Sequence, residues 1–232
     1  MKLLEGKTVL VTGTRRGMGR RMLELFSEHG ANLFAHARTY DAEHERYCQE
    51  IAARCGTQIW PIYFELTDQE GIKNAVKTIR GHKIPIDGLV NNAGITYNAL
   101  FHMTSFAELR NQMEVNFFAP YLLTQYISKM MVKEKKGSIV NISSSAALDG
   151  NSGKSAYGAS KAALVAMTLV ISEELAVSGI RANAICPGVT DTEMLGTVPE
   201  YVLDDMWSEG TSMSIEGVNM VDYKDVEIIP FK

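Results

Sequence analysis

Short runs of apolar and β-branched residues alternate along the chain with longer segments in which apolar residues recur every three or four positions. The short runs are typical of buried strands, and the longer segments are typical of amphipathic helices. Strands are predicted over residues 7–12, 31–35, 58–64, 86–90, 138–142 and 181–185, and helices over residues 18–29, 41–54, 68–80, 106–133 and 157–177. This alternation predicts an α/β fold with a parallel sheet and right-handed crossovers.

Composition excludes several classes of protein. The chain has 232 residues, 46% of them hydrophobic and 22% charged, which suits one globular domain over residues 1–232. Its formal net charge of -4 favours neither nucleic acid nor an anionic membrane as a partner. We see no apolar run near the roughly 18 residues of a membrane helix, and no signal-peptide pattern before the first strand. The three cysteines form no CxxC pair, which favours reduced thiols in the cytoplasm and predicts no metal site.

A glycine-rich turn, TGTRRGMG at residues 12–19, lies between the first predicted strand and the first predicted helix. There, backbone N–H groups and a helix N-terminus can meet a pyrophosphate, and glycines let the backbone approach it. The spacing is TGxxxGxG rather than the commoner GxGxxG, and a plain turn is the alternative. The predicted dinucleotide-binding residues of this turn are Gly13, Arg15, Arg16, Gly17, Met18 and Gly19.

The residues after the second strand bear on which dinucleotide binds. An acidic residue at this point would hold the adenosine ribose hydroxyls, but the sequence is HART at residues 36–39. Arg38 and Arg16 could instead clamp a 2′-phosphate through charge-assisted hydrogen bonds. We therefore predict NADP (NADPH) rather than NAD, with solvated surface arginines as the alternative.

Tyr157 and Lys161 are four residues apart, so a helix would place both side chains on one face. A nearby ammonium favours the phenolate and would lower the pKa of Tyr157 from its ordinary value near ~10. The pair could then act as a general acid or base on a substrate oxygen. The pair alone is weak evidence, because the same spacing occurs on many solvated helices.

Six short motifs follow one another along the chain: TGTRRGMG at 12–19, NNAG at 91–94, VN at 115–116, GSIVNISS at 137–144, YGASK at 157–161 and NAICPG at 183–188. Together they resemble the short-chain dehydrogenase/reductase family, most of all its bacterial 3-oxoacyl-(acyl-carrier-protein) reductase-like members. The resemblance extends from about residue 4 to residue 194. It implies a single-domain Rossmann fold, a doubly wound parallel β-sheet flanked by helices.

The resemblance also implies catalytic roles. Tyr157 would protonate the substrate carbonyl as hydride arrives, and Ser144 would donate a hydrogen bond to the same oxygen. Lys161 would lower the pKa of Tyr157 and bind the nicotinamide ribose. Asn116 would kink its helix and hold a water molecule in a proton relay to Lys161.

Further cofactor contacts are implied around these residues. The adenine would meet Glu65 and Leu66, and the loop after strand six would meet the nicotinamide carboxamide. The strand-end turn NNAG could be an ordinary turn, but it lies at the carboxyl edge where ligands bind in such sheets. The predicted contacts beyond the glycine turn are Arg38, Glu65, Leu66, Asn92, Ala93, Gly94, Tyr157, Lys161, Pro187, Gly188, Val189 and Thr192.

The chain departs from the family pattern in two places. Glu65 stands where the family usually has Asp, and we expect this to have little effect because Glu also accepts a hydrogen bond. The segment 193–232 looks shortened and atypical, with one helix near 199–207 and residues 217–222 in place of the usual last strand. A short lid would leave an open site, suited to a large or carrier-bound carbonyl substrate.

We interpret the sequence as that of an NADPH-dependent oxidoreductase that reduces a ketone, with a 3-oxoacyl thioester as a candidate substrate. A keto-sugar, a steroid or another alcohol would use the same catalytic residues. A dinucleotide-binding scaffold or sensor is the alternative from another class, favoured by the short carboxyl end and opposed by the intact Ser144, Tyr157 and Lys161. By resemblance, the helices bearing Asn116 and Tyr157 would pack across a homo-oligomer interface, in a dimer or a tetramer.

Overall fold

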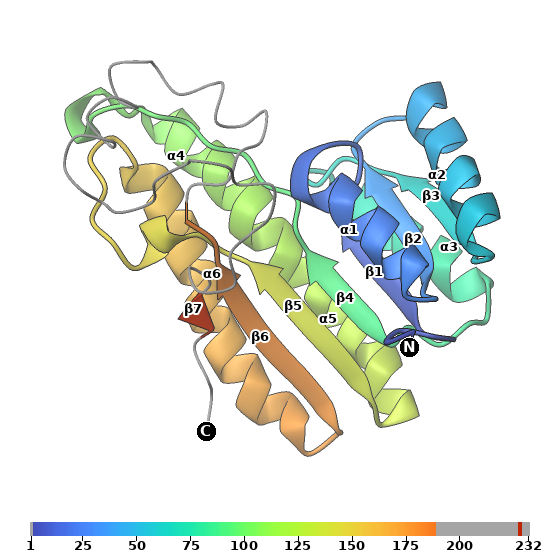
Figure 1. Cartoon of the computed structure of the whole chain (residues 1–232). Helices are drawn as coiled ribbons and strands as arrows, with labels where there is room; N and C mark the ends of the chain where they lie inside the picture. Colours follow the sequence, from blue (N-terminus) through green and yellow to red (C-terminus); the bar gives the residue numbers. More distant parts are fainter. Residues whose placement is uncertain (1, 189–226, 229–232) are drawn as a thin grey trace.

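The computed structural model describes residues 2–188 and 227–228, and in them a single sheet lies between two layers of helices (Figure 1). Its strand order is β3-β2-β1-β4-β5-β6-β7. The strands are β1 (Thr8–Thr12), β2 (Asn32–Ala37), β3 (Ile59–Tyr63), β4 (Gly88–Asn91), β5 (Gly137–Ile142), β6 (Ile180–Cys186) and β7 (Glu227–Ile228). Strands β1 to β6 pair in parallel, which confirms the predicted α/β fold. The two-residue β7 was not predicted, and it pairs antiparallel with β6.

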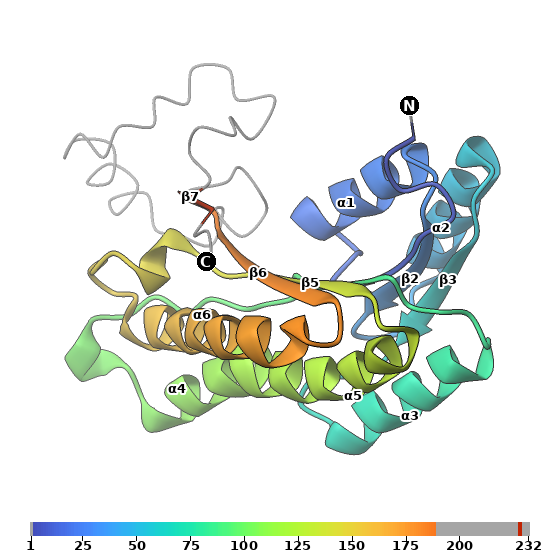
Figure 2. The same cartoon turned by 90° about the horizontal axis from the view of Figure 1, so that it is seen from below.

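Helices cover both faces of the sheet (Figure 2). On one face lie α1 and α2, and on the other lie α3, α5 and α6. The helices are α1 (Gly17–Glu28), α2 (Ala42–Cys55), α3 (Gln69–Gly81), α4 (Phe106–Met113), α5 (Ala119–Glu134) and α6 (Ser155–Ala176). Local caps agree with these bounds: the Asp41 side chain accepts a hydrogen bond from Glu43 N–H at the start of α2, and Gly56 ends that helix in the left-handed conformation.

The strands at the centre of the sheet are mostly apolar because helices cover the sheet on both faces. All five residues of β1 are buried, and successive side chains point into different clusters. Leu10 packs with Leu89 and Ile139 in the cluster beneath α3 and α5. Val9 and Val11 belong to the cluster beneath α1 and α2. The double burial fixes the strand register, since a one-residue slip would exchange the two sets of side chains.

The helix predicted over residues 106–133 is interrupted. A π-helical turn, Glu114–Phe118, separates α4 from α5, and Asn116 lies within it. Such a turn inserts an extra residue into the helix and redirects the side chains around it. The irregularity lies where the family resemblance placed a kink.

Helix α6 is apolar enough to meet a length-and-composition criterion for crossing a membrane, with a mean hydropathy of 1.3, although no such run was expected. This is weak evidence, because the core helix of a globular domain meets the same criterion. Helix α6 packs against β6 and buries Ser160, Lys161 and Thr168. We therefore interpret it as a core helix. The elements expected at 199–207 and 217–222 lie outside the described residues.

Candidate active site

The glycine turn joins β1 to α1 at the carboxyl edge of the sheet (Figure 1). Gly13 and Gly17 have φ values of 74° and 55°, which favour glycine. A Cβ on Gly19 would overlap the carbonyl oxygen of Gly13 and come within 2.6 Å of Asn92 Nδ2. The turn is therefore packed backbone against backbone, with no room for a side chain at residue 19.

The first turn of α1 is suited to an anion. Its N-cap residue, Arg16, supplies no side-chain cap, and no acidic residue occupies the first turn. The N–H groups and the positive end of the helix dipole thus face no carboxylate from their own helix. This arrangement fits a pyrophosphate at the glycine turn.

The predicted residues after β4 hold the glycine turn in place. Asn92 donates its backbone N–H to Thr12 Oγ1 at 2.9 Å and its side-chain amide to the Thr12 carbonyl at 2.8 Å. Ala93 N–H donates to the same Thr12 hydroxyl at 3.0 Å. A Cβ on Gly94 would lie 3.0 Å from Asn116 Oδ1 and 3.2 Å from Lys161 Nζ. The structure therefore brings Asn92, Ala93 and Gly94 between the glycine turn and α6.

Two buried histidines beneath the glycine turn were missed by the sequence analysis. His36 Nδ1 accepts a hydrogen bond from Gly13 N–H at 3.2 Å, so its Nε2–H donates to the Phe64 carbonyl at 2.9 Å. The Thr14 hydroxyl donates to the His36 carbonyl and accepts from His44 Nε2 at 2.8 Å. His36 directly follows the strand predicted over residues 31–35 and His44 lies in the helix predicted over residues 41–54, so neither pattern indicated a buried histidine.

Burial lowers the pKa of His36 from 6.5 to about 4, so this side chain is neutral in the folded protein at neutral pH. The unfolded chain takes up the proton near pH 6.5, and the folded chain does so only near pH 4. The free energy of unfolding should therefore fall by about 3 kcal/mol as pH drops through this window. Urea denaturation at neutral pH and at about pH 4.5 measures the loss.

The variant His36→Gln should show a shallower pH dependence over that window, because its side chain cannot titrate. The exposed His102 provides a matched control: His102→Gln leaves His36 in place, so the loss of stability at low pH should persist. An unchanged slope in His36→Gln would show that another group causes the acid sensitivity.

The predicted adenosine-phosphate residues lie at the ends of β2 and β3. Arg38 directly follows β2 and is three-quarters exposed, and its Nε lies 3.7 Å from Glu65 Oε2. Leu66, beside Glu65, is buried in the core. Arg15 pairs with Asp41 at 2.5 Å, which holds its guanidinium against the start of α2. The structure thus brings Arg38 and Glu65 together and engages Arg15 in an ion pair that the sequence did not suggest.

Tyr157 and Lys161 lie in the first two turns of α6. Lys161 is buried, and its Nζ donates to the Ile142 carbonyl at 2.8 Å, while its own carbonyl accepts from Ser143 Oγ at 2.9 Å. Burial lowers the pKa of Lys161 from 10.5 to about 8. Its ammonium lies 5.9 Å from the Tyr157 ring centroid.

The pKa of Tyr157 shifts in the direction opposite to the prediction. Burial of the phenolate raises this pKa above 10.0, and the hydrogen bond with Ser144 opposes the rise. The Lys161 ammonium bonds the Ile142 carbonyl and lies 5.9 Å from the ring centroid, and the pKa of Tyr157 is raised despite its presence. The predicted net lowering is therefore wrong, because burial outweighs the hydrogen bond with Ser144.

Asn116 links the loop after β4 to α6. Its Oδ1 accepts from Ile95 N–H at 2.9 Å, and its Nδ2 donates to the Ile95 carbonyl at 2.9 Å and to Ser160 Oγ at 3.0 Å. The Ser160 hydroxyl in turn donates to the Tyr157 carbonyl at 2.7 Å. The π-helical turn thereby holds the first turn of α6 against the loop at residue 95.

The loop after β6 supports the segment that carries Ser144. The Pro187 carbonyl accepts from Ser145 N–H at 2.9 Å, one residue after Ser144, and Gly188 follows it. The predicted carboxamide contacts Val189 and Thr192 lie outside the described residues. Ser144 Oγ also accepts from Ala146 N–H at 3.2 Å, which caps a short 3₁₀ turn.

Comparison with known sequences agrees with this geometry. A family model described as short chain dehydrogenase matches residues 7–202. The 3-oxoacyl-[acyl-carrier-protein] reductase FabG of Aquifex aeolicus is 34% identical over 199 residues, which are 86% of this chain and 80% of that protein. The enzyme of the same name from Thermotoga maritima is 36% identical over 199 residues, which are 85% of this chain and 79% of that protein.

Solved structures with the same fold hold different dinucleotides. A Beutenbergia cavernae protein assigned as an NAD(P)-dependent gluconate 5-dehydrogenase, with bound NADP, has a TM-score of 0.80 and 31% identity over 88% of this chain and 80% of that chain. NAD⁺-bound xylitol dehydrogenase has a TM-score of 0.75 and 26% identity over 81% of this chain and 72% of that chain. Both a phosphorylated and an unphosphorylated ribose are thus compatible with this architecture.

Proposed function

Because the chain belongs to the short-chain dehydrogenase family, we propose that it reduces a ketone to an alcohol with NADPH as the hydride donor. The observation that carries the proposal is the hydrogen-bonded pair Tyr157 and Ser144 beside the buried Lys161. The glycine turn and the first turn of α6 meet at the same edge of the sheet, which is where ligands bind in doubly wound folds.

Each catalytic side chain has a role in this proposal. The cofactor supplies the hydride. Tyr157 retains its proton at neutral pH because burial raises its pKa, so it can donate that proton to the substrate oxygen. Ser144 donates a hydrogen bond where negative charge develops. Lys161 holds a positive charge next to the ring and stabilises the phenolate left after proton transfer.

We propose that the chain prefers NADP to NAD, and the position of Arg38 supports this preference. This side chain is exposed at the end of β2, where a 2′-phosphate would lie, and Arg16 belongs to the adjoining turn. Arg38→Ala should weaken NADPH binding by about tenfold to a hundredfold and leave NADH binding within about twofold. Fluorescence titration with each dinucleotide measures both effects.

Arg54 is a suitable control for this substitution. It is an exposed arginine in the last turn of α2, near Glu28 at 3.6 Å, away from the carboxyl edge. Arg54→Ala should bind both dinucleotides like the wild type. Equal affinities of the wild-type protein for NADPH and NADH would overturn the proposed preference.

The substrate class is proposed from the relatives. The two reductases named above support a 3-oxoacyl thioester, carrier-bound or free. The structural neighbours assigned to gluconate and xylitol support a keto-sugar as the second candidate. An assay that follows loss of NADPH absorbance with a 3-oxoacyl thioester, a keto-sugar and a steroid ketone separates these classes. Dinucleotide binding without turnover of any ketone would favour the sensor alternative.

We also propose that a second copy of the chain covers an apolar face of α5 and α6. Phe118 and Tyr121 near the start of α5, and Leu169 and Val170 on α6, are exposed apolar side chains. Such a patch is typical of an interface, and a dimer or tetramer would bury it.

The three cysteines are free thiols, which supports our proposal of a cytoplasmic location.

A further inference from the structure

Lys154 is a half-buried cation beside the catalytic tyrosine that the proposed mechanism does not use. It directly precedes α6, and its Nζ donates to Thr96 Oγ1 at 3.4 Å, in the loop after β4. The same ammonium lies 5.5 Å from the Tyr157 ring centroid. Lys154 therefore lies between the two loops that border the catalytic tyrosine.

The folded chain gains little stability from a cation in this position. Burial lowers the pKa of Lys154, because desolvation disfavours the ammonium. The residue also stands at the N-terminus of α6, where the helix dipole disfavours positive charge. Within residues 2–188 and 227–228, no carboxylate forms an ion pair with Lys154 to offset these costs. An anionic partner supplied by a ligand would do so.

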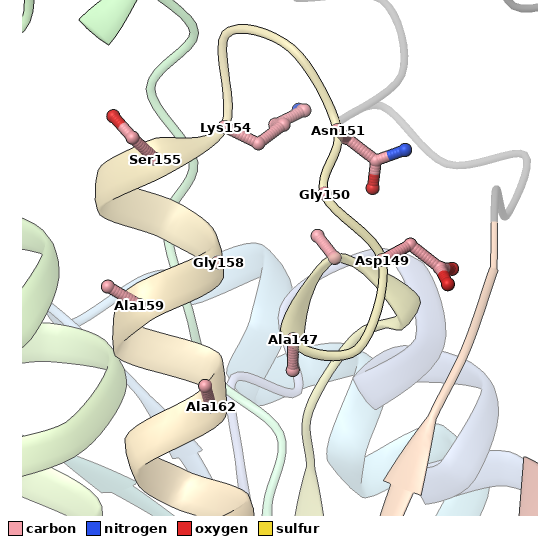
Figure 3. A pocket seen from close by; sticks show the side chains of 10 residues that line it. Ala147, Asp149, Gly150, Asn151, Lys154, Ser155, Gly158, Ala159 and Ala162 are labelled. Atoms are coloured by element: carbon pink, nitrogen blue, oxygen red, sulfur yellow. The ribbon is translucent and has the colours of Figure 1, made fainter.

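A cavity beside Lys154 borders the start of α6. It has a volume of about 250 Å³ and lies between α6 and the loop from Ala146 to Asn151 (Figure 3). Lys154 stands where this loop enters the helix, and its side chain extends toward Asn151. Gly158 and Ala162 line the helix side with little steric bulk. Asp149 lines the loop side but forms no ion pair with Lys154 in the part of the chain that is described.

We propose that Lys154 determines substrate specificity by binding a carboxylate of the substrate, a few bonds from the carbonyl that is reduced. The proposal rests on the reductase function above. The Tyr157 hydroxyl must reach the reacting oxygen, and Lys154 is held over the ring of the same tyrosine. A single ammonium matches a singly charged carboxylate better than a doubly charged phosphate, which usually requires several donors.

The test compares substrates that differ only in charge. The 2-oxo, 3-oxo and 4-oxo acids and their methyl esters are assayed with NADPH against the wild type, Lys154→Gln and Lys154→Arg. We expect the wild type to favour one acid over its ester, and Lys154→Gln to lose roughly 30-fold or more in kcat/KM for that acid. The ester should change by less than about threefold, and Lys154→Arg should retain most of the preference.

A binding measurement separates this proposal from the reductase proposal. Calorimetric titration of each of the three acids into the NADP-bound protein should give a weaker Kd for Lys154→Gln with at least one of them, with NADP affinity itself unchanged. If no ketone is turned over, the titration still tests Lys154. Equal binding of the acids by wild type and Lys154→Gln, or equal turnover of acids and esters by the wild type, would overturn the assignment.

Discussion

Replacing Tyr157 with Phe should lower kcat for ketone reduction by roughly a hundredfold to ten-thousandfold, the usual contribution of a positioned general acid. The substitution removes only the hydroxyl that hydrogen-bonds with Ser144, and the ring keeps its place between Lys154 and Lys161. Affinity for NADPH should therefore stay within about threefold of wild type. Steady-state assays and a fluorescence titration distinguish the two quantities.

Tyr126 provides the matched control, because it is a partly buried tyrosine packed against the core on α5. Tyr126→Phe should leave kcat unchanged. The raised pKa of Tyr157 adds a further expectation: reduction should persist into the alkaline range, and the decline that follows loss of the phenol proton should be absent from Tyr157→Phe. Wild-type turnover by Tyr157→Phe would contradict the proposed mechanism.

Replacing Gly19 with Ala should abolish measurable dinucleotide binding and lower the free energy of unfolding by roughly 2–3 kcal/mol. The new methyl group would overlap the carbonyl oxygen of Gly13, a backbone atom that can move only if the whole turn moves. Displacing Gly13 would also break its hydrogen bond to His36. NADPH titration and urea denaturation measure the two effects.

Gly81 is the matched control for that substitution. It ends α3, and a Cβ there would meet nothing within 4 Å. Gly81→Ala should leave binding unchanged and stabilise the protein by up to about 1 kcal/mol, since alanine costs less backbone entropy in a helix. If Gly19→Ala bound NADPH as tightly as Gly81→Ala, the close packing of the turn would not matter for the cofactor.

Local sequence patterns determined most of the fold. A short β-branched and apolar run such as residues 7–12 is typical of a strand buried on both faces, and the glycine spacing at residues 13–19 permits a close turn before a helix. The four-residue spacing of Tyr157 and Lys161 sufficed to place both on one helix, which the structure confirms. These features depend on neighbours within a few residues, so the sequence alone is sufficient for them.

Contacts between distant segments determined the features of the candidate site that local sequence patterns did not predict. The π-helical turn around Asn116 is invisible in the periodicity, and its side chain is held by Ile95 and Ser160 from two other segments. The direction of the Tyr157 pKa depends on how much of the fold covers the ring. His36 and Lys154 became candidates only when folding surrounded them with specific partners. Burial and long-range hydrogen bonds set the electrostatics of this site, and both arise only when the chain packs in three dimensions.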